Sequence, residues 1–424
     1  MPAALVAPLT SVRPALNCGL LGRKLSHSYS PAIHEAFGGY NYKLFEVEPP
    51  DIPAFMARDD FNGLNVTIPY KKTVLEYCRQ LSPAASEIGS VNTMLRLPGG
   101  GFYGDNTDVS GFKKMLSQTG LAIPGKKVIV FGKGGSSLTV RHVMKELGAA
   151  EIVIVSRQDN NHEFLRHHKD AAILVNSTPV GMYPGNDETP VSLDYFPCLE
   201  GVFDLVYNPA RTRLLTEAKK RNLAHIGGLS MLVGQAAAAS EIFTGKNVSE
   251  EKEQAVMRLL RRRMENIVLV GMPGCGKTTI GQMLAEKMDK RFVDTDAVIE
   301  QTAGCSIPEI FSREGEEGFR KRETEALKIT GKESGLVIAT GGGGVTREEN
   351  YAHLHQNGSI IFMERSLDKL ARKDRPLSQG SLEEMYENRQ SLYRRFADRV
   401  VRNDGEVSAT VEIIMEALDE VTGN

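Results

Sequence analysis

The stretch GMPGCGKT, residues 271–278, has the glycine spacing of a loop that wraps phosphate groups. It stands directly after the apolar run NIVLVG and before a helical stretch, which is the context that this motif requires. Lys277 can reach the β and γ oxygens of a nucleotide, and Thr278 can hold a magnesium ion. The pattern predicts ATP or GTP as a ligand. The predicted binding residues are Gly271, Gly274, Cys275, Gly276, Lys277, Thr278 and Thr279.

A pair of aspartates follows the next apolar run. In FVDTDAVIE, Asp294 and Asp296 stand two residues apart at a strand end, so both can face the crevice that holds the phosphates. One carboxylate can bind Mg²⁺, directly or through water, while the other meets the hydroxyl that accepts the phosphoryl group. Taken alone, the pair is equally compatible with surface carboxylates in a turn.

A second glycine turn, FGKGGSS, follows an apolar run and predicts a dinucleotide site. Gly132, Gly134 and Ser137 stand at the fingerprint positions, with serine in place of the third glycine. The next strand, EIVIV, leads to Ser156 and Arg157, where an NAD enzyme usually offers an acidic residue to the ribose 2′-hydroxyl. Arg157 suits a 2′-phosphate and favours NADPH, and a merely solvated arginine is the alternative. The predicted cofactor residues are Gly132, Lys133, Gly134, Gly135, Ser136, Ser156 and Arg157.

These loops require sets of parallel strands to position them. Before residue 263, short β-branched runs alternate with helical stretches, and VIVFG to EIVIVS forms a βαβ unit of nucleotide-binding type. After it, NIVLVG, RFVDTD, GLVIATGG and SIIFME are four buried-strand runs separated by helices, which predicts a three-layer α/β domain with a parallel sheet. SEEKEQAVMRLLRRR has the charge order of a helix, and the domain boundary is expected where it ends.

Length and composition indicate a globular protein of two or three domains. The chain has 424 residues, of which 41% are hydrophobic and 25% charged. A net charge of −2 gives no reason to expect nucleic acid or an anionic membrane as partner, and no run of about 20 apolar residues exists. Five unpatterned cysteines argue against a disulfide framework or zinc site and favour a reducing, cytoplasmic location. The start MPAALVAPLTSVRPAL lacks a signal peptide's basic region and is expected to be a loose extension.

Further motifs follow the aspartates at a spacing similar to that of shikimate kinases. They are GEEGFRKRETEAL, IATGGGGV, DRPLS and LYRRFAD, and the chain from about residue 264 to 420 resembles that family. The resemblance implies that Asp294 serves Mg²⁺ and that Asp296 meets the 3-hydroxyl of shikimate. It also implies that Arg320 and Arg394 clamp the substrate carboxylate, to which a guanidinium can donate two hydrogen bonds.

The same resemblance assigns roles to a glycine run and a lid. Arg375 matches the lid arginine that closes over ATP and offsets charge on the transferring phosphoryl group. The lid stretch LARKDRPLS is several residues shorter than usual, which puts an adenine contact by Arg372 in doubt and predicts altered lid closure. Glu323 either orients Arg320 or is an ordinary exposed helical glutamate. The run against which the substrate lies corresponds to Gly341, Gly342 and Gly343.

The first part of the chain, from residue 18 to about 260, is similar to shikimate dehydrogenases. The motifs that carry this similarity are LSHSYSPAIHEAF, NVTIPYKK, GSVNTM, GDNTD and GGLSMLVGQAA. The resemblance implies that Lys71 and Asp108 form the catalytic pair, in which the lysine approaches the reacting oxygen and can pass it a proton. A surface salt bridge between them is the alternative. The residues implied to bind substrate are Ser28, Ser30, Asn65, Thr67, Asn92, Tyr207 and Gln235.

The resemblance also divides this first part. It implies a substrate subdomain of about residues 14–110 and 225–263 and a Rossmann-like NADP subdomain of about 111–224. It adds Asn176, in a loop near the nicotinamide, and Gly228 to the cofactor residues. Between SRQDNN and AAILVNSTP the chain is much shorter than in the family, where another helix and strand normally fit. A trimmed nucleotide subdomain with reshaped adenosine binding is therefore expected.

Together the two resemblances predict a fused, bifunctional enzyme with domains at residues 1–263 and 264–424. Reduction of 3-dehydroshikimate by NADPH gives shikimate, and ATP with Mg²⁺ then gives shikimate 3-phosphate. The alternatives are use of quinate or NAD by the first domain, and a non-catalytic sensor of quinate or shikimate. Small molecules are the expected partners, with no nucleic acid and no membrane, and homo-oligomerisation is left open.

Overall fold

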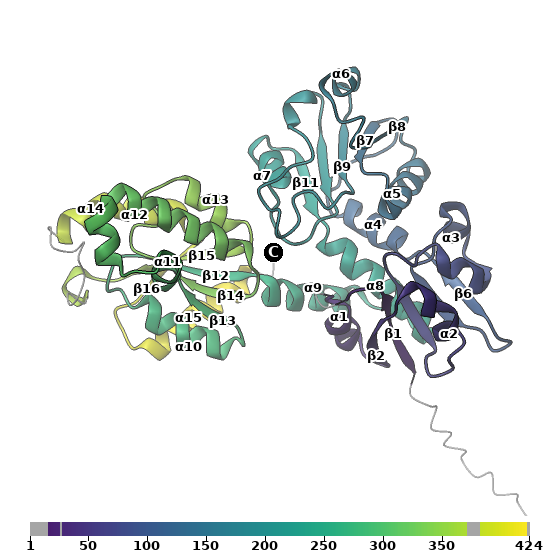
Figure 1. Ribbon diagram of the computed structural model, residues 1–424, viewed down its shortest axis with the longest axis horizontal. Helices are drawn as coiled ribbons and strands as arrows, with labels where there is room; N and C mark the ends of the chain where they lie inside the picture. Colours follow the sequence, from purple (N-terminus) through teal and green to yellow (C-terminus); the bar gives the residue numbers. More distant parts are fainter. Residues whose placement is uncertain (1–15, 26–27, 371–381, 422–424) are drawn as a thin grey trace, which may run out of the picture. The chain divides into compact units, whose positions relative to one another are not determined.

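The computed structural model describes residues 16–25, 28–370 and 382–421 (Figure 1). The chain folds into two compact units. The first unit consists of Met1–Gln118, Gly134–Gly148 and Ser230–Val256, and the second of Thr119–Lys133, Ala149–Leu229 and Met257–Asn424. Within the described residues, the first unit contains one sheet and the second contains two.

The sheet of the first unit has the strand order β2-β1-β3-β5-β6-β4. Its strands are β1 (Asn17–Gly22), β2 (Asn41–Glu46), β3 (Gly63–Val66), β4 (Cys78–Leu81), β5 (Thr93–Arg96) and β6 (Phe102–Asp105). β1 pairs in parallel with β2 and β3, whereas β5 runs antiparallel to β3 and β6. The helices are α1 (Ser30–Phe37), α2 (Ile52–Met56), α3 (Pro83–Ile88), α4 (Asp108–Ser117), α5 (Gly135–Glu146) and most of α8 (Leu229–Thr244).

Two helices of this unit approach each other closely because one of them carries a glycine at the crossing. A Cβ added to Gly111 of α4 would lie 2.4 Å from the carbonyl oxygen of Met231 and 2.9 Å from the backbone nitrogen of Gln235, both on α8. The missing side chain therefore fixes α4, which begins at Asp108, against α8, which carries Gln235.

The first sheet of the second unit is parallel throughout, with the order β11-β10-β9-β7-β8. Its strands are β7 (Lys127–Phe131), β8 (Glu151–Val155), β9 (Ile173–Asn176), β10 (Gly201–Asp204) and β11 (Ala224–Gly227). In chain order this is 2-1-3-4-5, whereas a Rossmann sheet usually begins with a third strand beside the second. Between β8 and β9 lies only the six-residue helix α6 (His162–His167), while α7 (Arg213–Lys220) precedes β11. This order agrees with the short segment predicted from the sequence.

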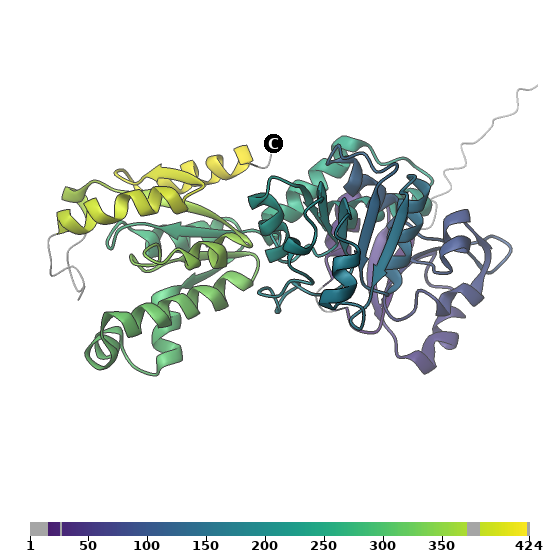
Figure 2. The same ribbon diagram turned by 90° about the horizontal axis from the view of Figure 1, so that it is seen from above.

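The other sheet of the second unit is also parallel, with the order β13-β14-β12-β15-β16. Its strands are β12 (Asn266–Val270), β13 (Arg291–Asp294), β14 (Leu336–Ala339), β15 (Gly358–Glu364) and β16 (Arg399–Arg402). Helices lie on both faces, as the turned view shows (Figure 2). They are α10 (Lys277–Lys287), α11 (Thr295–Ala303), α12 (Ile307–Lys332), α13 (Glu349–His355), α14 (Leu382–Phe396) and α15 (Val407–Val421). The predicted three-layer α/β domain is confirmed.

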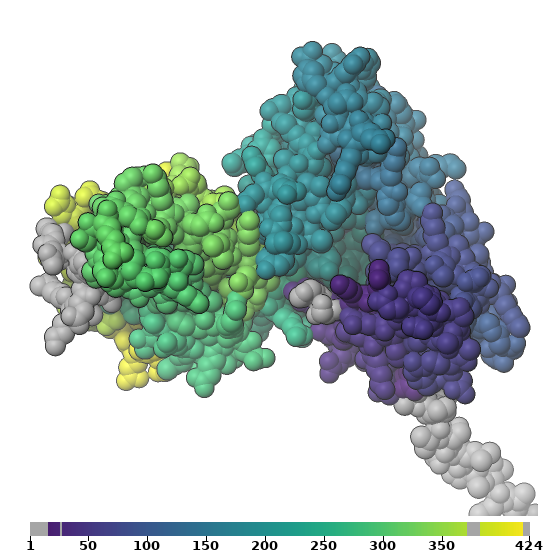
Figure 3. Space-filling view, viewed as in Figure 1, coloured from purple at the N-terminus to yellow at the C-terminus, as the bar shows by residue number. Residues whose placement is uncertain are grey.

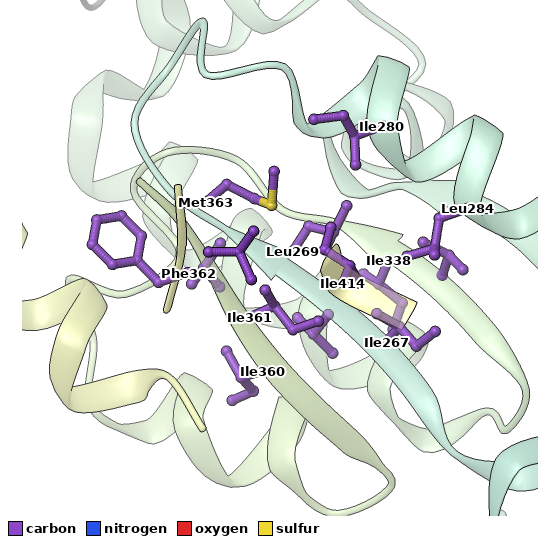
Figure 4. Close-up of a cluster of buried hydrophobic side chains, with 14 of the residues drawn as sticks. Ile267, Leu269, Ile280, Leu284, Ile338, Ile360, Ile361, Phe362, Met363 and Ile414 are labelled. Atoms are coloured by element: carbon purple, nitrogen blue, oxygen red, sulfur yellow. The ribbon is translucent and has the colours of Figure 1, made fainter. Parts of the chain in front are cut away.

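The core of this domain is a hydrophobic cluster around the central strands (Figure 4). Every residue of β12 and β14 is buried, because strands inside a parallel sheet are covered on both faces. Leu269, Ile338 and Ile360 of three neighbouring strands are fully buried together. In the space-filling view, the green segment that contains α12 and α13 forms part of the face of this domain that is turned to the viewer (Figure 3).

The helix α9 (Glu250–Met264) confirms the helix predicted from SEEKEQAVMRLLRRR. Its first turn holds Glu250, Glu251 and Glu253 and its last turn Arg261, Arg262 and Arg263, the order that complements a helix dipole. All five cysteines are free in the structure. Over the part of the chain that the structure describes, no helix is long and apolar enough to cross a membrane.

The buried cluster predicts where substitutions destabilise the second unit. Ile360→Ala removes a fully buried side chain and should lower the free energy of unfolding by about 2–5 kcal/mol, because it leaves a cavity. Ile413→Ala, at a side chain that is 47% exposed, should change it by less than about 0.5 kcal/mol. Urea unfolding followed by circular dichroism measures both, and equal effects would contradict the assigned core.

Candidate active sites

The predicted pair of Lys71 and Asp108 is formed in the first unit. Lys71 Nζ lies 2.6 Å from Asp108 Oδ2, and the two side chains are 21% and 12% exposed. The other carboxylate oxygen of Asp108 accepts a hydrogen bond from Asn92 Nδ2 at 2.9 Å. The pair is therefore largely buried and has a third, neutral partner, unlike an ordinary surface salt bridge.

A network of buried amide and hydroxyl groups extends from this pair. Asn92 Oδ1 accepts from Thr107 N at 2.7 Å and from Thr93 Oγ1 at 3.1 Å. Thr93 Oγ1 in turn accepts from Asn65 Nδ2 at 3.1 Å, and the hydroxyl of Tyr42 donates to Asn65 Oδ1 at 2.8 Å. Buried polar groups satisfied in this way have little freedom to rotate. The predicted substrate residues Asn65 and Asn92 are thus held in fixed orientations.

The buried side chain of His34, which the sequence motifs do not mark as functional, packs against this network. His34 stacks on Tyr42 with ring centroids 4.0 Å apart, and its Nδ1 lies 2.6 Å from the hydroxyl of Tyr40. Burial lowers the pKa of His34 to about 3, so the ring is neutral near pH 7. His34 and Tyr42 lie in α1 and β2, and only the folded chain brings them behind Asn65.

The remaining predicted substrate residues of the first unit lie at strand and helix ends. Ser28 and Ser30 stand at the start of α1, where Ser30 N donates to Ser28 Oγ at 3.2 Å. Thr67 follows β3, and its backbone nitrogen donates to Leu21 O of β1 at 2.9 Å. Gln235 lies on α8, where its Nε2 donates to Leu232 O at 2.9 Å.

The glycine turn after β7 requires glycine at its first position. Gly132 has φ of +116°, and a Cβ there would lie 2.6 Å from Ser177 Oγ, so a side chain would be both strained and blocked. Gly134 and Gly135 are exposed at the start of α5, and an added Cβ on either would meet nothing within 4 Å. Ser136 is half-buried beside them. The turn therefore offers open backbone at a helix N-terminus, as phosphate binding requires.

At the end of β8, Arg157 is exposed and makes no hydrogen bond or ion pair with any residue that the structure describes. Its neighbour Ser156 donates from its backbone nitrogen to Asp159 Oδ2 at 3.1 Å, and from its hydroxyl to the same oxygen. Lys133, in the glycine turn, lies 3.4 Å from that oxygen. Sequence reasoning named Lys133, Ser156 and Arg157 but not Asp159.

Three other predicted cofactor or substrate residues shape loops in the second unit. Asn176 is fully buried and donates to Val180 O at 3.1 Å and Asp204 Oδ1 at 2.9 Å. Gly228 lies so close to the backbone of Leu205 that an added Cβ would lie 2.1 Å from Leu205 O. Tyr207 is half-buried in the loop after β10.

The phosphate loop between β12 and α10 has its three motif glycines at positive φ: Gly271 at +151°, Gly274 at +84° and Gly276 at +94°. Lys277 is buried, and its Nζ donates to Gly271 O at 2.8 Å and to Met272 O at 3.0 Å. The lysine is thus held over the loop whose backbone nitrogens would surround a phosphate.

Next to this loop, Thr278 and Asp294 offer oxygen atoms suited to Mg²⁺. Thr278 Oγ1 donates to Asp294 Oδ2 at 2.9 Å, and Asp294 Oδ1 accepts from Asp296 N at 3.1 Å as the cap of α11. Among the described residues no group of three or more His, Cys, Asp or Glu could hold a metal. A hydroxyl and one carboxylate fit Mg²⁺ at a phosphate site, where the ion keeps several waters and binds phosphate oxygens.

The predicted acceptor residues converge over the glycine run after β14. A Cβ on Gly343 would lie 1.8 Å from Arg320 Nη1, and one on Gly341 would lie 2.6 Å from Glu323 Oε1 and 2.8 Å from Asp296 Oδ1. Arg320 Nη1 donates to Glu323 Oε2 at 2.7 Å. Glu323 is only 1% exposed, so it orients Arg320 and is not a surface glutamate; burial raises its pKa, against the charge of Arg320.

The motif predicts Arg394 as the second arginine of this cluster, whereas the structure places Arg389 there. Arg394 lies apart from it, with a side chain that is 49% exposed and paired with Glu364. Arg389 instead donates to Gly342 O at 3.3 Å, and its charge partly opposes the rise that burial causes in the pKa of Glu323. The hydroxyl of Tyr393 donates to the same carbonyl at 2.5 Å. Arg389 and Tyr393 are four residues apart on α14 and therefore share the helix face that contacts Gly342, whereas Arg394 lies one position further round the helix.

Two lid residues named from the sequence, Arg372 and Arg375, lie outside the described residues.

Comparison with known families matches both parts of the chain. Residues 273–419 match the family model described as shikimate kinase. Residues 20–94 match that of the shikimate dehydrogenase substrate binding domain, and residues 228–258 match that of the shikimate 5'-dehydrogenase C-terminal domain.

Relatives and solved structures resemble the first part. The shikimate dehydrogenase (NADP(+)) of Clostridium beijerinckii is 38% identical over 247 residues, covering 53% of this chain and 90% of that protein. A chorismate mutase/shikimate 5-dehydrogenase fusion protein from Clostridium acetobutylicum has a TM-score of 0.55 at 33% identity, covering 58% of this chain and 97% of that one. Shikimate 5-dehydrogenase from Thermus thermophilus, in complex with NADP(H) and shikimate, has a TM-score of 0.52 at 32% identity, covering 57% and 99%.

The match to the shikimate dehydrogenase (NADP(+)) of Methanopyrus kandleri also reflects the trimmed segment. The two sequences are 39% identical over 277 aligned positions, which cover 95% of that protein. The same alignment covers 57% of this chain, which is about 240 of its 424 residues. The relative therefore has residues without counterparts here, in agreement with the short connection between β8 and β9.

The buried imidazole of His34 makes the first unit sensitive to acid. Because the folded state lowers its pKa from 6.5 to about 3, the unfolded chain binds more protons in this window, and stability falls as pH drops from 6.5 toward 3. His34→Phe keeps an aromatic ring and should reduce the loss of unfolding free energy between about pH 7 and about pH 5. Urea unfolding at both pH values tests this, and an unchanged pH slope would contradict it.

Proposed function

The chain belongs to the shikimate dehydrogenase family and carries a shikimate kinase domain in the same chain, and we propose that these parts catalyse two successive reactions on one cyclohexene carboxylate. The protein is a bifunctional enzyme of the shikimate pathway. In the proposed sequence, 3-dehydroshikimate is reduced to shikimate, and shikimate is phosphorylated to shikimate 3-phosphate. The observation that carries the proposal is the convergence of Arg320, Glu323 and Asp296 beside a phosphate loop, in a chain that also forms the Lys71–Asp108 pair.

In the dehydrogenase reaction, the carbonyl carbon gains a hydride and the oxygen gains a proton. NADPH supplies the hydride when bound. Lys71 donates a hydrogen bond to the reacting oxygen, stabilises its developing charge and passes it a proton. Asp108, fixed by Asn92, holds the ammonium in position. Asn65, Thr67, Ser28 and Ser30 bind hydroxyl and carboxylate groups of the ring, and Arg157 would bind the 2′-phosphate of the cofactor.

In the kinase reaction, the 3-hydroxyl oxygen of shikimate attacks the γ-phosphorus of ATP, the bond from that phosphorus to the β-γ bridging oxygen breaks to release ADP, and the hydroxyl proton passes to the carboxylate of Asp296. Asp296 accepts the hydrogen bond of this hydroxyl, and Lys277 stabilises the β and γ oxygens. Thr278 and Asp294 hold Mg²⁺, which offsets phosphate charge when bound. Arg320 and Arg389 bind the substrate carboxylate, in place of the predicted pair of Arg320 and Arg394. By the family resemblance, Arg375, which lies outside the described residues, offsets charge on the transferring phosphoryl group.

Three broader proposals complete this function. We propose that the dehydrogenase occupies residues 1–263 and the kinase residues 264–424, and that the free cysteines reflect a cytoplasmic location. A non-catalytic sensor needs substrate pockets only, whereas this chain keeps the Lys71–Asp108 pair and a complete phosphate loop with Lys277. These residues support two enzymes.

Separate substitution of Lys71 and Lys277 tests whether each proposed site catalyses only one of the two reactions. Lys71→Ala should lower NADP-dependent oxidation of shikimate by about 10²- to 10⁴-fold and leave ATP-dependent phosphorylation intact, because only the first reaction uses its proton. Lys277→Ala should abolish phosphorylation only. Lys72→Ala, at the exposed neighbouring lysine, is the matched control and should affect neither rate. Loss of both activities in either single variant, or no shikimate turnover by the wild type, would refute the proposal.

The choice between Arg389 and Arg394 is tested with the kinase reaction alone. A charged hydrogen bond contributes about 1.5–3 kcal/mol, so Arg389→Ala should raise the KM for shikimate by about 10- to 100-fold. The KM for ATP should change much less. Arg394→Ala should leave both values near those of the wild type. A larger effect of Arg394→Ala on shikimate would restore the original prediction.

A further inference from the structure

The carboxylate of Asp159 occupies a position that donors from two loops create. Its Oδ2 accepts from the backbone nitrogen of Ser156 at 3.1 Å and from the hydroxyl of the same residue. The ammonium of Lys133 lies 3.4 Å from this oxygen. Lys133 comes from the glycine turn after β7 and Ser156 from the end of β8, two neighbouring parallel strands. Three donors thus surround one anionic oxygen.

This position coincides with the place where the adenosine ribose lies in dinucleotide-binding folds, between the glycine turn and the end of the second strand. Two groups of opposite charge stand there. Arg157 is exposed, without a hydrogen bond or ion pair among the described residues, and can bind a 2′-phosphate. Asp159, two residues later, already uses the donors of Ser156 and Lys133.

We propose that Asp159 is a specificity-determining residue of the dehydrogenase, whose carboxylate competes with the 2′-phosphate for Ser156 and Lys133 and so narrows the preference for NADP over NAD. A 2′-phosphate must displace this carboxylate and is repelled by its charge. A ribose 2′-hydroxyl can instead donate a hydrogen bond to it. The inference rests on the proposed dehydrogenase function and concerns its cofactor.

A purely structural role makes a different prediction. Ser156 and Asp159 also close the turn at residues 157–159, and a residue that only closes this turn would affect both cofactors alike. Asp159→Asn separates the two roles, because the amide keeps an oxygen that accepts from Ser156 but carries no charge. Asp170→Asn is the matched control. It removes one exposed carboxylate that pairs with Lys127 of the same sheet.

The experiment uses the full chain and two soluble probes, adenosine 2′,5′-bisphosphate and 5′-AMP, with binding measured by calorimetry. Asp159→Asn should tighten binding of the bisphosphate by about two- to fivefold, as expected for removal of a like charge at a half-buried site, and should not tighten binding of 5′-AMP. The ratio of kcat/KM with NADP to that with NAD, measured with shikimate, should rise by a similar factor. Asp170→Asn should leave both measurements unchanged.

Three outcomes would overturn the inference: unchanged affinity for the bisphosphate, a parallel loss of both probes, or an equal effect of Asp170→Asn. Retained binding of 5′-AMP by each variant reports that the sheet carrying residue 159 is folded. If the wild type oxidised no shikimate with either cofactor, the proposed dehydrogenase function would fail, whereas the binding measurements would still decide the role of Asp159.

Discussion

The chemistry of this chain depends on one geometric constraint, which is that parallel strands bring their carboxyl ends and the loops after them to a common edge. In the first unit, β1 and β3 are paired in parallel and end just before the turn of Ser28 and the segment of Lys71. In the last sheet, β12, β13 and β14 end at the phosphate loop, at Asp294 and just before Gly341. Residues far apart in sequence meet there because buried strands hold the register.

Both candidate sites keep a buried or half-buried cation beside a carboxylate. Lys71 has Asp108 as its partner, and Arg320 has Glu323 and the more exposed Glu316. A charge removed from water without a partner costs several kcal/mol, so pairing allows these cations to stay in place. Neutral groups such as Asn92 then fix the carboxylates. The result is a pair of sites whose polar atoms are oriented by the fold.

Local motifs predicted much of this arrangement, because glycine loops and strand ends are determined by neighbouring residues. The phosphate loop, Asp294 and the trimmed connection before β9 could all be read from the sequence. The layer behind the first site could not, since His34 meets the network only through tertiary packing. The prediction of Arg394 as the second arginine of the clamp rests on the motif alone. A motif gives residue types, whereas the face of α14 that points to Gly342 depends on helix phase, which favours Arg389.

Among the strands that the structure describes, β8 has a neighbour on one side only, β7. Its residues Ile152–Val155 are all β-branched and apolar, a composition that promotes intermolecular strand pairing when an edge is open. The exposed, charged Glu151 and Arg157 flank this run and act as gatekeepers against such pairing. Because the shortened segment leaves the edge of β8 uncovered within the described sheet, the solubility of the protein depends on the two charged residues that flank this apolar run.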